Sequence, residues 1–389
     1  MTRDLPRIHW PASVSRPVAT PIHPSVVYAS DGPDQLDAQY EGRTKGWTYS
    51  REGHPNAAVL ADRIAALEGA PRPGIVTGSG MAAITAVMMA LLEKGDRVVG
   101  GDQLYGRCLR MMREELPRMG FACALADPTD AAAMRRALDG GARLVLVEVV
   151  SNPTLRIADI DGIAAACREA GALLVVDNTF TTPLGFAPFE HGADIVLHSV
   201  TKLLAGHSDA MLGWACARDA DLQARIDVTA VTLGLTPSPF DCWLAERGLH
   251  SFALRFEKAC RNAEALAARL DGLPGMARVL HPGRPDHPDA NRAAGLLASA
   301  GNMVSFEIEG GRPAAQRLVE AAEGIAFAPT LGDVATTLSH PATSSHRALT
   351  PEQRAALGMS EGFFRVSVGC EAEGPLLDAF ERAVRAAAG

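Results

Sequence analysis

Short runs of apolar residues alternate with helical patterns through the middle of the chain. Runs with the length and branched-chain content of buried strands occupy residues 74–77, 97–99, 144–149, 173–176 and 195–197. Helical patterns occupy residues 57–67, 81–93 and 163–170, and the first of these ends at Gly69. Strands that alternate with helices form parallel sheets that are covered by helices on both faces. This region therefore predicts an α/β fold with a mostly parallel sheet.

The chain on either side of this region has a different pattern. Residues 1–55 are rich in proline, glycine and polar residues and show little periodicity, which is unusual inside a compact domain. We therefore expect an arm that packs against another subunit. A long helical pattern at residues 244–270 could connect two domains.

The last third of the chain predicts a smaller α+β domain. Its expected strands are residues 303–308 and 364–368, and its last helix is residues 376–387. The predicted division of the chain is an arm at 1–55, a cofactor-binding α/β domain at 56–245, and a connecting helix with the C-terminal domain at 246–389.

Two reactive residues follow neighbouring apolar runs. Asp177 ends the run at residues 172–176, and Lys202 follows the run at residues 194–197 in the stretch HSVTK. The carboxyl ends of parallel strands meet at one edge of a sheet, where open α/β sheets bind their ligands. A lysine and a buried carboxylate at this edge fit pyridoxal 5'-phosphate (PLP), because the lysine forms the Schiff base and the carboxylate keeps the ring nitrogen protonated. The simpler alternatives are a surface lysine for Lys202 and a helix N-cap for Asp177.

A glycine-rich turn, TGSGMAA at residues 77–83, lies between a predicted strand and a predicted helix. Gly80 and Met81 would offer backbone N–H groups at the helix N-terminus, which is a ready anion site. The turn also matches the G-x-G-x-x-A fingerprint of nicotinamide oxidoreductases, with Asp96 or Asp102 as the ribose-binding acid. That alternative leaves the lysine and carboxylate pair unexplained, and a plain strand-to-helix turn is the third interpretation.

Other polar residues are predicted at the same edge of the sheet. Ser199 and Thr201 place two hydroxyl groups beside the lysine and could hold a phosphate. Tyr105 could stack on a planar cofactor and Asn152 could donate to its phenolate oxygen, although a core tyrosine and an ordinary N-P turn are the alternatives. Arg365, in a short alternating strand, suits a carboxylate clamp or else faces water on an edge strand.

Composition and charge disfavour several classes of protein. The net charge of −8 disfavours a nucleic-acid partner. The seven cysteines include no C-x-x-C pair, and His281, His287 and His340 lie near prolines, so we expect no metal and no disulfide framework. No apolar signal segment begins the chain, and the longest apolar run, residues 81–92, is too short to cross a bilayer. We expect a cytoplasmic enzyme that acts on a small molecule, away from any membrane.

Together these motifs resemble the Cys/Met metabolism (trans-sulfuration) family of PLP-dependent enzymes, which includes cystathionine β- and γ-lyases, methionine γ-lyases and cystathionine γ-synthases. The resemblance runs from about residue 17 to the C-terminus. The stretches that carry it are YSREGHPN, GSGMAAI, YG at 105–106, SNPT, VDNTF, HSVTK, GHSDAMLG, SPFDCWLAERGL, HPAT and RVSVGCE. The resemblance implies the type I aminotransferase fold, PLP as the cofactor, an amino acid as the substrate, and a homotetramer built from two catalytic dimers.

The resemblance also implies roles for individual residues. The implied catalytic residues are Lys202, Tyr105 and Asp177. The implied cofactor-binding residues are Gly80, Met81, Tyr105, Asn152, Asp177, Ser199, Thr201 and Lys202, joined by Tyr49 and Arg51 from the neighbouring subunit. The implied substrate-binding residues are Arg365, which would hold the α-carboxylate, Asn152 and Thr330.

Some positions depart from the usual pattern of the family, and of these Arg107, Asp333 and Ala335 are expected near the distal end of the substrate. Arg107 and Cys108 follow Gly106, where YGGT or YGC is usual, and Ala335 stands where many members have a glutamate. The implied activity is a C–S lyase that acts by β- or γ-elimination on cystathionine- or methionine-type amino acids to give a thiol, a 2-keto acid and ammonia. The alternatives are a γ-replacement enzyme (a cystathionine γ-synthase or an O-acylhomoserine sulfhydrylase), a nicotinamide oxidoreductase, and a non-catalytic relative that binds PLP.

Overall fold

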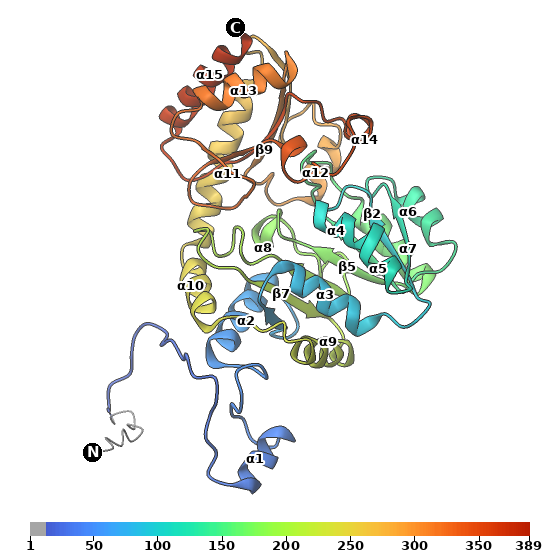
Figure 1. Ribbon diagram of the computed structural model, residues 1–389, viewed down its shortest axis with the longest axis vertical. Coiled ribbons are helices and arrows are strands. Elements are labelled where there is room, and N and C mark those ends of the chain that lie inside the picture. The colour runs from blue at the N-terminus through green and yellow to red at the C-terminus, as the bar shows by residue number, and fades with distance from the viewer. Residues whose placement is uncertain (1–12) are drawn as a thin grey trace, which may run out of the picture.

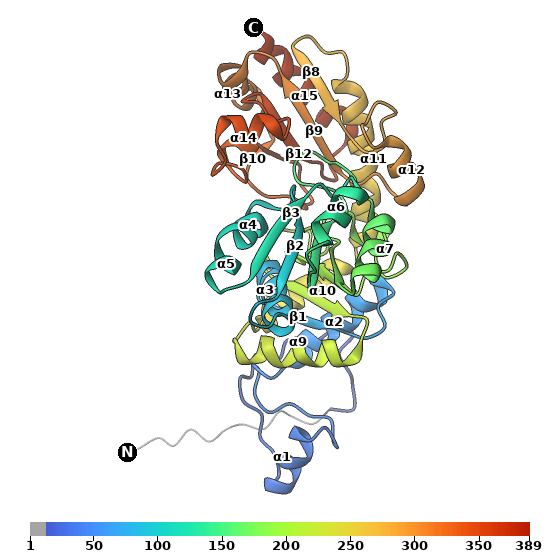
Figure 2. The ribbon, with the colours of Figure 1, turned by 90° about the vertical axis from the view of Figure 1, so that its right-hand side faces the viewer.

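The computed structural model describes residues 13–389. Figure 1 shows three parts along the long axis of the molecule: an N-terminal segment at the bottom, a large sheet covered by helices in the middle, and a smaller part at the top that holds the C-terminus. The view in Figure 2, turned by 90°, shows the same three parts in the same order.

The large sheet has seven strands in the order β1-β7-β6-β5-β4-β2-β3. The pairs within β3-β2-β4-β5-β6 are parallel, and β7 pairs antiparallel with both β6 and β1. Its strands are β1 (Ile75–Thr77), β2 (Arg97–Gly101), β3 (Ala122–Ala126), β4 (Leu144–Glu148), β5 (Leu173–Asp177), β6 (Ile195–His198) and β7 (Gly213–Ala217). The mostly parallel sheet confirms the predicted fold class, whereas β3 and β7 were not expected from the apolar pattern.

Helices cover both faces of this sheet, so alternate residues of each central strand enter different cores. In β4, Leu144 and Leu146 join the core formed with α3, while Val145 and Val147 join the core formed with α2 and α7. All four side chains are buried, which explains why the strands appear in the sequence as continuous apolar runs. The helices of this part are α2 (Pro55–Glu68), α3 (Gly80–Leu91), α4 (Gly106–Arg110), a π-helical turn η1 (Met111–Glu115), α5 (Leu116–Arg118), α6 (Ala131–Leu138), α7 (Ile160–Ala170), α8 (Thr182–Gly185) and α9 (Ala220–Thr232).

The helical pattern at residues 244–270 is divided between two helices, which differs from the single helix that the sequence predicts. Helix α10 (Pro239–Leu249) ends before His250, and α11 (Phe252–Leu270) begins after Ser251. The Gly248 carbonyl at the break accepts hydrogen bonds from Arg255 Nη2 at 3.0 Å and from Ser251 Oγ at 3.3 Å. These side chains satisfy a carbonyl that a continuous helix would have bonded internally. The predicted boundary at residue 245 falls within α10, and the proposed division of the chain stays a prediction.

The C-terminal part contains a five-stranded sheet in the order β10-β11-β12-β9-β8, with helices packed against it. Phe306 and Phe364 stack in its core with ring centroids 5.4 Å apart, and Phe380 of the last helix meets Phe306 edge-on at 6.5 Å. The elements are β8 (Met276–Leu280), α12 (Ala290–Leu296), β9 (Met303–Ile308), α13 (Gly311–Ala321), β10 (Ala326–Phe327), β11 (Thr337–Ser339), a 3-10 turn η2 (Pro341–Thr343), α14 (Pro351–Ala356), β12 (Phe363–Ser367) and α15 (Glu373–Ala388). This part confirms the predicted α+β fold.

The N-terminal segment extends away from both sheets in Figures 1 and 2. It contains a short helix, α1 (Pro33–Tyr40), that the sequence pattern did not indicate. Few contacts tie the segment to the body, among them the hydrogen bond from Trp243 Nε1 to the Thr20 carbonyl at 2.8 Å. Val14 and Val18 are fully exposed, as expected for an arm with no core of its own. Over residues 13–389, no helix combines the length and apolar character needed to cross a membrane.

Candidate active site

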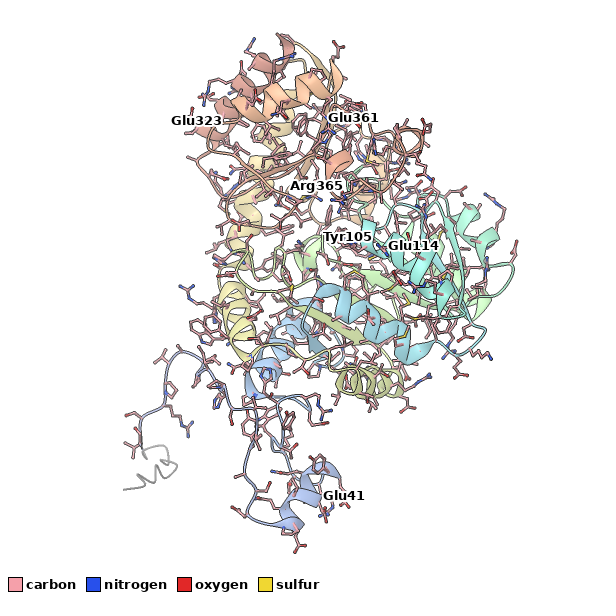
Figure 3. The ribbon with its side chains drawn as sticks, in the orientation of Figure 1. Glu41, Tyr105, Glu114, Glu323, Glu361 and Arg365 are labelled. Carbon is pink, nitrogen blue, oxygen red and sulfur yellow. The ribbon has the colours of Figure 1, made fainter. Side chains whose placement is uncertain are left out.

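A cleft of about 810 Å³ lies at the carboxyl edge of the large sheet and is closed on its other side by the C-terminal part. In Figure 3, Arg365 lies at the lower end of the C-terminal part, and Tyr105 lies below it at the upper edge of the part that holds the large sheet. The predicted site residues that line the cleft are Gly80, Met81, Tyr105, Asn152, Asp177, Ser199, Thr201, Lys202, Thr330 and Arg365. Residues from at least four strand ends therefore meet in one cavity, as the sequence predicts.

Lys202 follows β6 and reaches into the cleft. Its Nζ lies 3.5 Å from Thr330 Oγ1, which belongs to the C-terminal part. Burial lowers the pKa of Lys202, and the nearby positive charge of Arg365 lowers it further. A lowered pKa favours the neutral amine, which is the form that can attack a carbonyl or accept a proton.

Asp177, the last residue of β5, is held by the residue two positions after it. Asp177 Oδ1 accepts hydrogen bonds from the Thr179 backbone N–H at 2.9 Å and from Thr179 Oγ1 at 2.5 Å. Thr179 Oγ1 in turn accepts a hydrogen bond from the Ser199 N–H at 2.8 Å, so one hydroxyl joins the ends of β5 and β6. Burial raises the pKa of Asp177, and these hydrogen bonds and His198 oppose the rise. A cationic ring nitrogen beside this carboxylate would favour its charged form.

Glu148 is a site residue that the sequence analysis missed. It ends β4 directly beside Asp177 in the register of the sheet, and it also lines the cleft. Its Oε1 accepts a hydrogen bond from the Tyr105 N–H at 2.6 Å, which fixes the start of α4. Burial and the neighbouring Asp177 raise the pKa of Glu148 well above its usual range. The available sequence signal was a carboxylate at the end of an otherwise apolar strand, as for Asp177.

The glycine-rich turn forms a cradle at the N-terminus of α3. Ser79 caps the helix by accepting a hydrogen bond from the Ala82 N–H at 3.1 Å. A side chain at Gly80 would place its Cβ 2.8 Å from Ser199 Cβ, so only glycine allows the close approach of these two segments. First-turn N–H groups have no partner within the helix, and a phosphate suits the space between them and the Ser199 hydroxyl. The cradle therefore fits the phosphate of PLP.

The hydroxyl group of Thr201 is already used in hydrogen bonds to the backbone of its own chain. Its hydroxyl donates to the Leu212 carbonyl at 3.1 Å and accepts from the Leu212 N–H at 2.9 Å. The hydroxyl thus already holds the loop after Lys202, and phosphate binding by Thr201 stays a prediction.

Arg365 is a buried cation that the C-terminal part contributes to the cleft. Its Nη1 donates to Asn152 Oδ1 at 2.8 Å, and its Nη2 donates to the Thr330 carbonyl at 2.7 Å. Its Nε is buried and has no hydrogen-bond partner among the described residues. Burial lowers the pKa of Arg365 to about 10, which still leaves it charged at neutral pH. A buried cation with an unused donor is suited to a carboxylate ligand.

The loop that carries Asn152 is fixed by side chains that the sequence analysis did not single out. Gln103 Oε1 accepts hydrogen bonds from Ser151 Oγ at 3.2 Å and from Thr154 Oγ1 at 2.6 Å. Ser305 Oγ of the C-terminal sheet donates to the Pro153 carbonyl at 2.6 Å. The orientation of Asn152 toward Arg365 therefore depends on both parts of the chain.

Four predicted residues lie outside the cleft of their own chain. Tyr49 and Arg51 belong to the N-terminal segment, where the Arg51 guanidinium lies 5.5 Å from the centre of the Tyr49 ring. Neither residue lines the cleft, and a role in a neighbouring subunit stays a prediction. Asp333 and Ala335, expected near the distal end of the substrate, do not line it either. Within residues 13–389, no three His, Cys, Asp or Glu side chains gather as a metal site.

Comparisons with known proteins agree with this geometry. The profile of the family described as Cys/Met metabolism PLP-dependent enzyme matches residues 9–385. The cystathionine β-lyase MetC of Bacillus subtilis (strain 168) is 40% identical over 339 residues, which cover 87% of this chain and 86% of that protein. The cystathionine γ-synthase of Escherichia coli (strain K12) is 37% identical over 370 residues, covering 95% and 94%. The solved cystathionine γ-synthase from Xanthomonas oryzae pv. oryzae, in complex with cystathionine, superposes with a TM-score of 0.90 at 39% identity and covers 95% of this chain and 93% of that chain.

Proposed function

Because the chain belongs to the Cys/Met metabolism PLP-dependent enzymes, we propose that it is a carbon–sulfur lyase that acts on cystathionine- or methionine-type amino acids. Elimination at Cβ or Cγ would release a thiol, and hydrolysis would then give a 2-keto acid and ammonia. The observation that carries this proposal is that Lys202 and Arg365 line one cleft and that Thr330 contacts both. A nucleophilic amine and a carboxylate clamp in one cavity are what an amino-acid substrate requires.

PLP bound in this cleft supplies an electron-withdrawing ring that stabilises negative charge at the α-carbon of the substrate. We propose that Gly80, Met81 and Ser199 hold its phosphate, and that Asp177 pairs with its ring nitrogen. Tyr105 would stack on the ring, since its backbone is fixed to Glu148 and its side chain lines the cleft.

The substrate end of the proposal depends on the arginine. Arg365 would bind the α-carboxylate, and Asn152, which accepts its Nη1–H bond, would hold the guanidinium in place. Lys202 would then remove the α-proton and return it in a later step, because burial and the nearby Arg365 lower its pKa and so favour the neutral amine. Thr330, 3.5 Å from the lysine Nζ, would orient that amine.

A second candidate is γ-replacement. In this reaction an incoming thiol takes the place of the leaving group at Cγ, whereas in the lyase reaction the leaving group is eliminated and the product is hydrolysed. Two cystathionine γ-synthases are among the close matches in sequence and structure, which favours this alternative. The two activities use the same residues for the α-proton and the carboxylate, so the difference lies in what the outer part of the cleft admits.

We further propose a catalytic dimer, and a homotetramer of two such dimers, in which Tyr49 and Arg51 of one subunit reach the phosphate site of another. The side chain of Arg51 is 48% exposed and its ion pair with Glu52 is long, at 3.5 Å. The segment that carries both residues extends away from its own body (Figure 1). A basic residue on an arm with few contacts to its own body is suited to binding a phosphate across an interface.

The deciding experiment is a panel of sulfur amino acids and O-acylhomoserines, assayed for keto acid and thiol with and without an added thiol acceptor. Lyase activity gives keto acid and thiol without the acceptor, and γ-replacement gives a new thioether only with it. The Lys202→Ala protein is the matched control. A chain that binds PLP and turns over no member of the panel would refute both candidates and leave a non-catalytic binder. Loss of the visible absorption of bound PLP in the Lys202 variant would rule out the nicotinamide alternative.

A further inference from the structure

Three polar side chains are buried together at the carboxyl ends of β5 and β6. They are Glu68, the last residue of α2, Asn178, which follows Asp177, and His198, the last residue of β6. His198 Nε2 pairs with Glu68 Oε1, and Asn178 Nδ2 donates to the same oxygen at 2.9 Å. None of the three lines the cleft, so any effect on the cofactor must pass through residues that do.

The alternation of side chains places this cluster on the opposite face of the sheet from Asp177. Asp177 pairs with Leu197 in the parallel register, and Leu197 joins the core formed with α3. Val196 joins the core formed with α2. Because successive side chains of a strand point to opposite faces, His198 faces α2 as Val196 does. Asp177 and His198 therefore lie at neighbouring strand ends, one on each face of the sheet.

The surroundings of His198 favour a positive charge on its imidazole. Glu68 Oε2 is buried and has no hydrogen-bond partner among the described residues, so hydrogen bonds compensate only one of the two carboxylate oxygens. Burying a carboxylate is costly unless a cation pairs with it. Glu68 also ends α2, which places the negative end of the helix dipole beside the pair. An imidazolium at His198 compensates both negative charges.

The charges beside His198 come from two elements. Helix α2 contributes Glu68, and β5 contributes Asp177, whereas its partner on β7 is the uncharged Trp214, with the two ring centroids 5.9 Å apart. Burial raises the pKa of Asp177, and its hydrogen bonds to Thr179 and the charge of His198 oppose the rise. A positive charge at His198 therefore favours the ionised form of Asp177 from behind the sheet.

We propose that Glu68 and His198 form a buried charge pair that keeps Asp177 ionised, so that Asp177 can hold the ring nitrogen of PLP in its protonated form. Glu68 keeps the imidazole cationic, and the cation offsets part of the cost of burying the Asp177 carboxylate. Both are positioning residues, since neither lines the cleft. The inference rests on the proposed role of Asp177 and adds the origin of its charge.

The test compares two cofactors that differ only in the ring nitrogen. PLP and its 1-deaza analogue, in which C–H replaces this nitrogen, share the phosphate and the aldehyde. The apoprotein is titrated with each, and the ratio of the two dissociation constants measures what the ring nitrogen contributes to binding. The variants are Glu68→Gln, His198→Gln and the double variant, which remove charge but keep a group that can form hydrogen bonds. Thr181→Val is the control, because it removes a hydrogen bond to Asn178 from the same cluster and no charge.

Wild type should bind PLP more tightly than the analogue. Glu68→Gln and His198→Gln should each weaken PLP binding about tenfold or more, as expected for the loss of one nearby opposite charge from a carboxylate, and leave the analogue within about twofold. The double variant should lose no more than either single variant, because the two residues act as a pair. Thr181→Val should change both dissociation constants by the same factor. Equal losses for PLP and the analogue in the charge variants would overturn the proposal, because the cluster would then be only structural.

Neutron diffraction of wild-type crystals gives a second measurement that needs no variant, since substitutions of buried residues can prevent folding. Protons on both ring nitrogens of His198, with none on Glu68, would support the charge pair. A neutral His198 or a protonated Glu68 would overturn it.

The Asp177→Asn protein separates failure of this inference from failure of the proposed function. It should lose the preference for PLP over the analogue. A preference that persists in Asp177→Asn would refute the pairing of Asp177 with the ring nitrogen, and with it the role of the buried pair. A preference that is lost in Asp177→Asn and kept in His198→Gln would refute only the role of the buried pair. Both results are independent of which sulfur amino acid the enzyme cleaves.

Discussion

Replacing Arg365 with methionine tests most directly whether this residue binds the α-carboxylate of the substrate. Arginine has five N–H donors, and in this structure one Nη1–H and one Nη2–H are used for Asn152 and Thr330 while Nε is free. Enough donors therefore remain for a paired contact with a substrate carboxylate. Methionine fills a similar volume without charge, and thermal unfolding measures how much stability the lost contacts to Asn152 and Thr330 cost.

The magnitude follows from the chemistry of that contact. A hydrogen bond to a charged partner contributes about 1.5–3 kcal/mol in a buried site. At about 1.4 kcal/mol per factor of ten, kcat/KM should fall roughly 10- to 150-fold. Because every amino-acid substrate has an α-carboxylate, the factor should be the same for methionine and cystathionine. The kcat/KM of Arg365→Lys should lie between those of wild type and Arg365→Met, because lysine keeps the positive charge but cannot form two parallel hydrogen bonds.

The assay is steady-state kinetics on both substrates for wild type, Arg365→Met and Arg365→Lys. Thermal unfolding of each protein excludes a general loss of structure. The reasoning would be refuted by a factor that differs more than about threefold between the two substrates, because the guanidinium would then contact the variable end. Unchanged kcat/KM would refute it as well, since no substrate group would then use the free Nε.

Three further predictions follow from the other side chains of the site. Asp177→Asn should still bind PLP, but its kcat should fall about 100-fold or more, because an amide cannot favour the protonated ring nitrogen. A wild-type kcat in this variant would show that Asp177 does not keep the ring nitrogen protonated. Burial raises the pKa of Glu148, so the wild-type protein should lose folding free energy as the pH rises from the unfolded value of about 4.3 toward the folded one. Glu148→Gln should keep the hydrogen bond to Tyr105 but lose this pH dependence, as measured by thermal unfolding of both proteins at pH 5 and pH 8. The same change in stability with pH in wild type and variant would contradict the prediction. Inactive Arg51→Ala and Lys202→Ala chains should regain partial activity when they are refolded together, because some sites of the mixed dimers carry neither substitution. Mixed dimers without activity would place Arg51 in the site of its own chain.

Strand ends could be predicted from the sequence because buried parallel strands appear as uninterrupted apolar runs. Asp177 was found because it directly follows such a run, and Lys202 because it comes shortly after the next one. The parallel register of β5 and β6 then places both at one edge of the sheet. The family and its cofactor were predicted correctly from short motifs around the same residues. Glu148 was missed although it has the same kind of position, because its run continues into Val149 and Val150 and hides the strand end.

Contacts between distant segments could not be predicted, because no local pattern encodes them. The approach of Gly106 to Ser345 joins residues from the two parts of the chain. The role of Gln103 in fixing the Asn152 loop likewise depends on two loops that are far apart in the sequence. The break at Ser251 is similar, because it is stabilised by the side chain of Arg255 and the pattern of apolar positions continues through it.

Both buried and exposed arginines line the cleft, and this contrast has a consequence for how new activities arise in such a protein. Arg365 is only 5% exposed, and its replacement disturbs a network that spans both sheets. Arg107 and Arg347 are exposed, and substitutions at exposed positions usually change the free energy of unfolding by less than about 0.5 kcal/mol. Substitutions at these two exposed positions could therefore change the shape and charge of the cleft at little cost in stability, whereas a substitution at Arg365 would also break the contacts to Asn152 and Thr330.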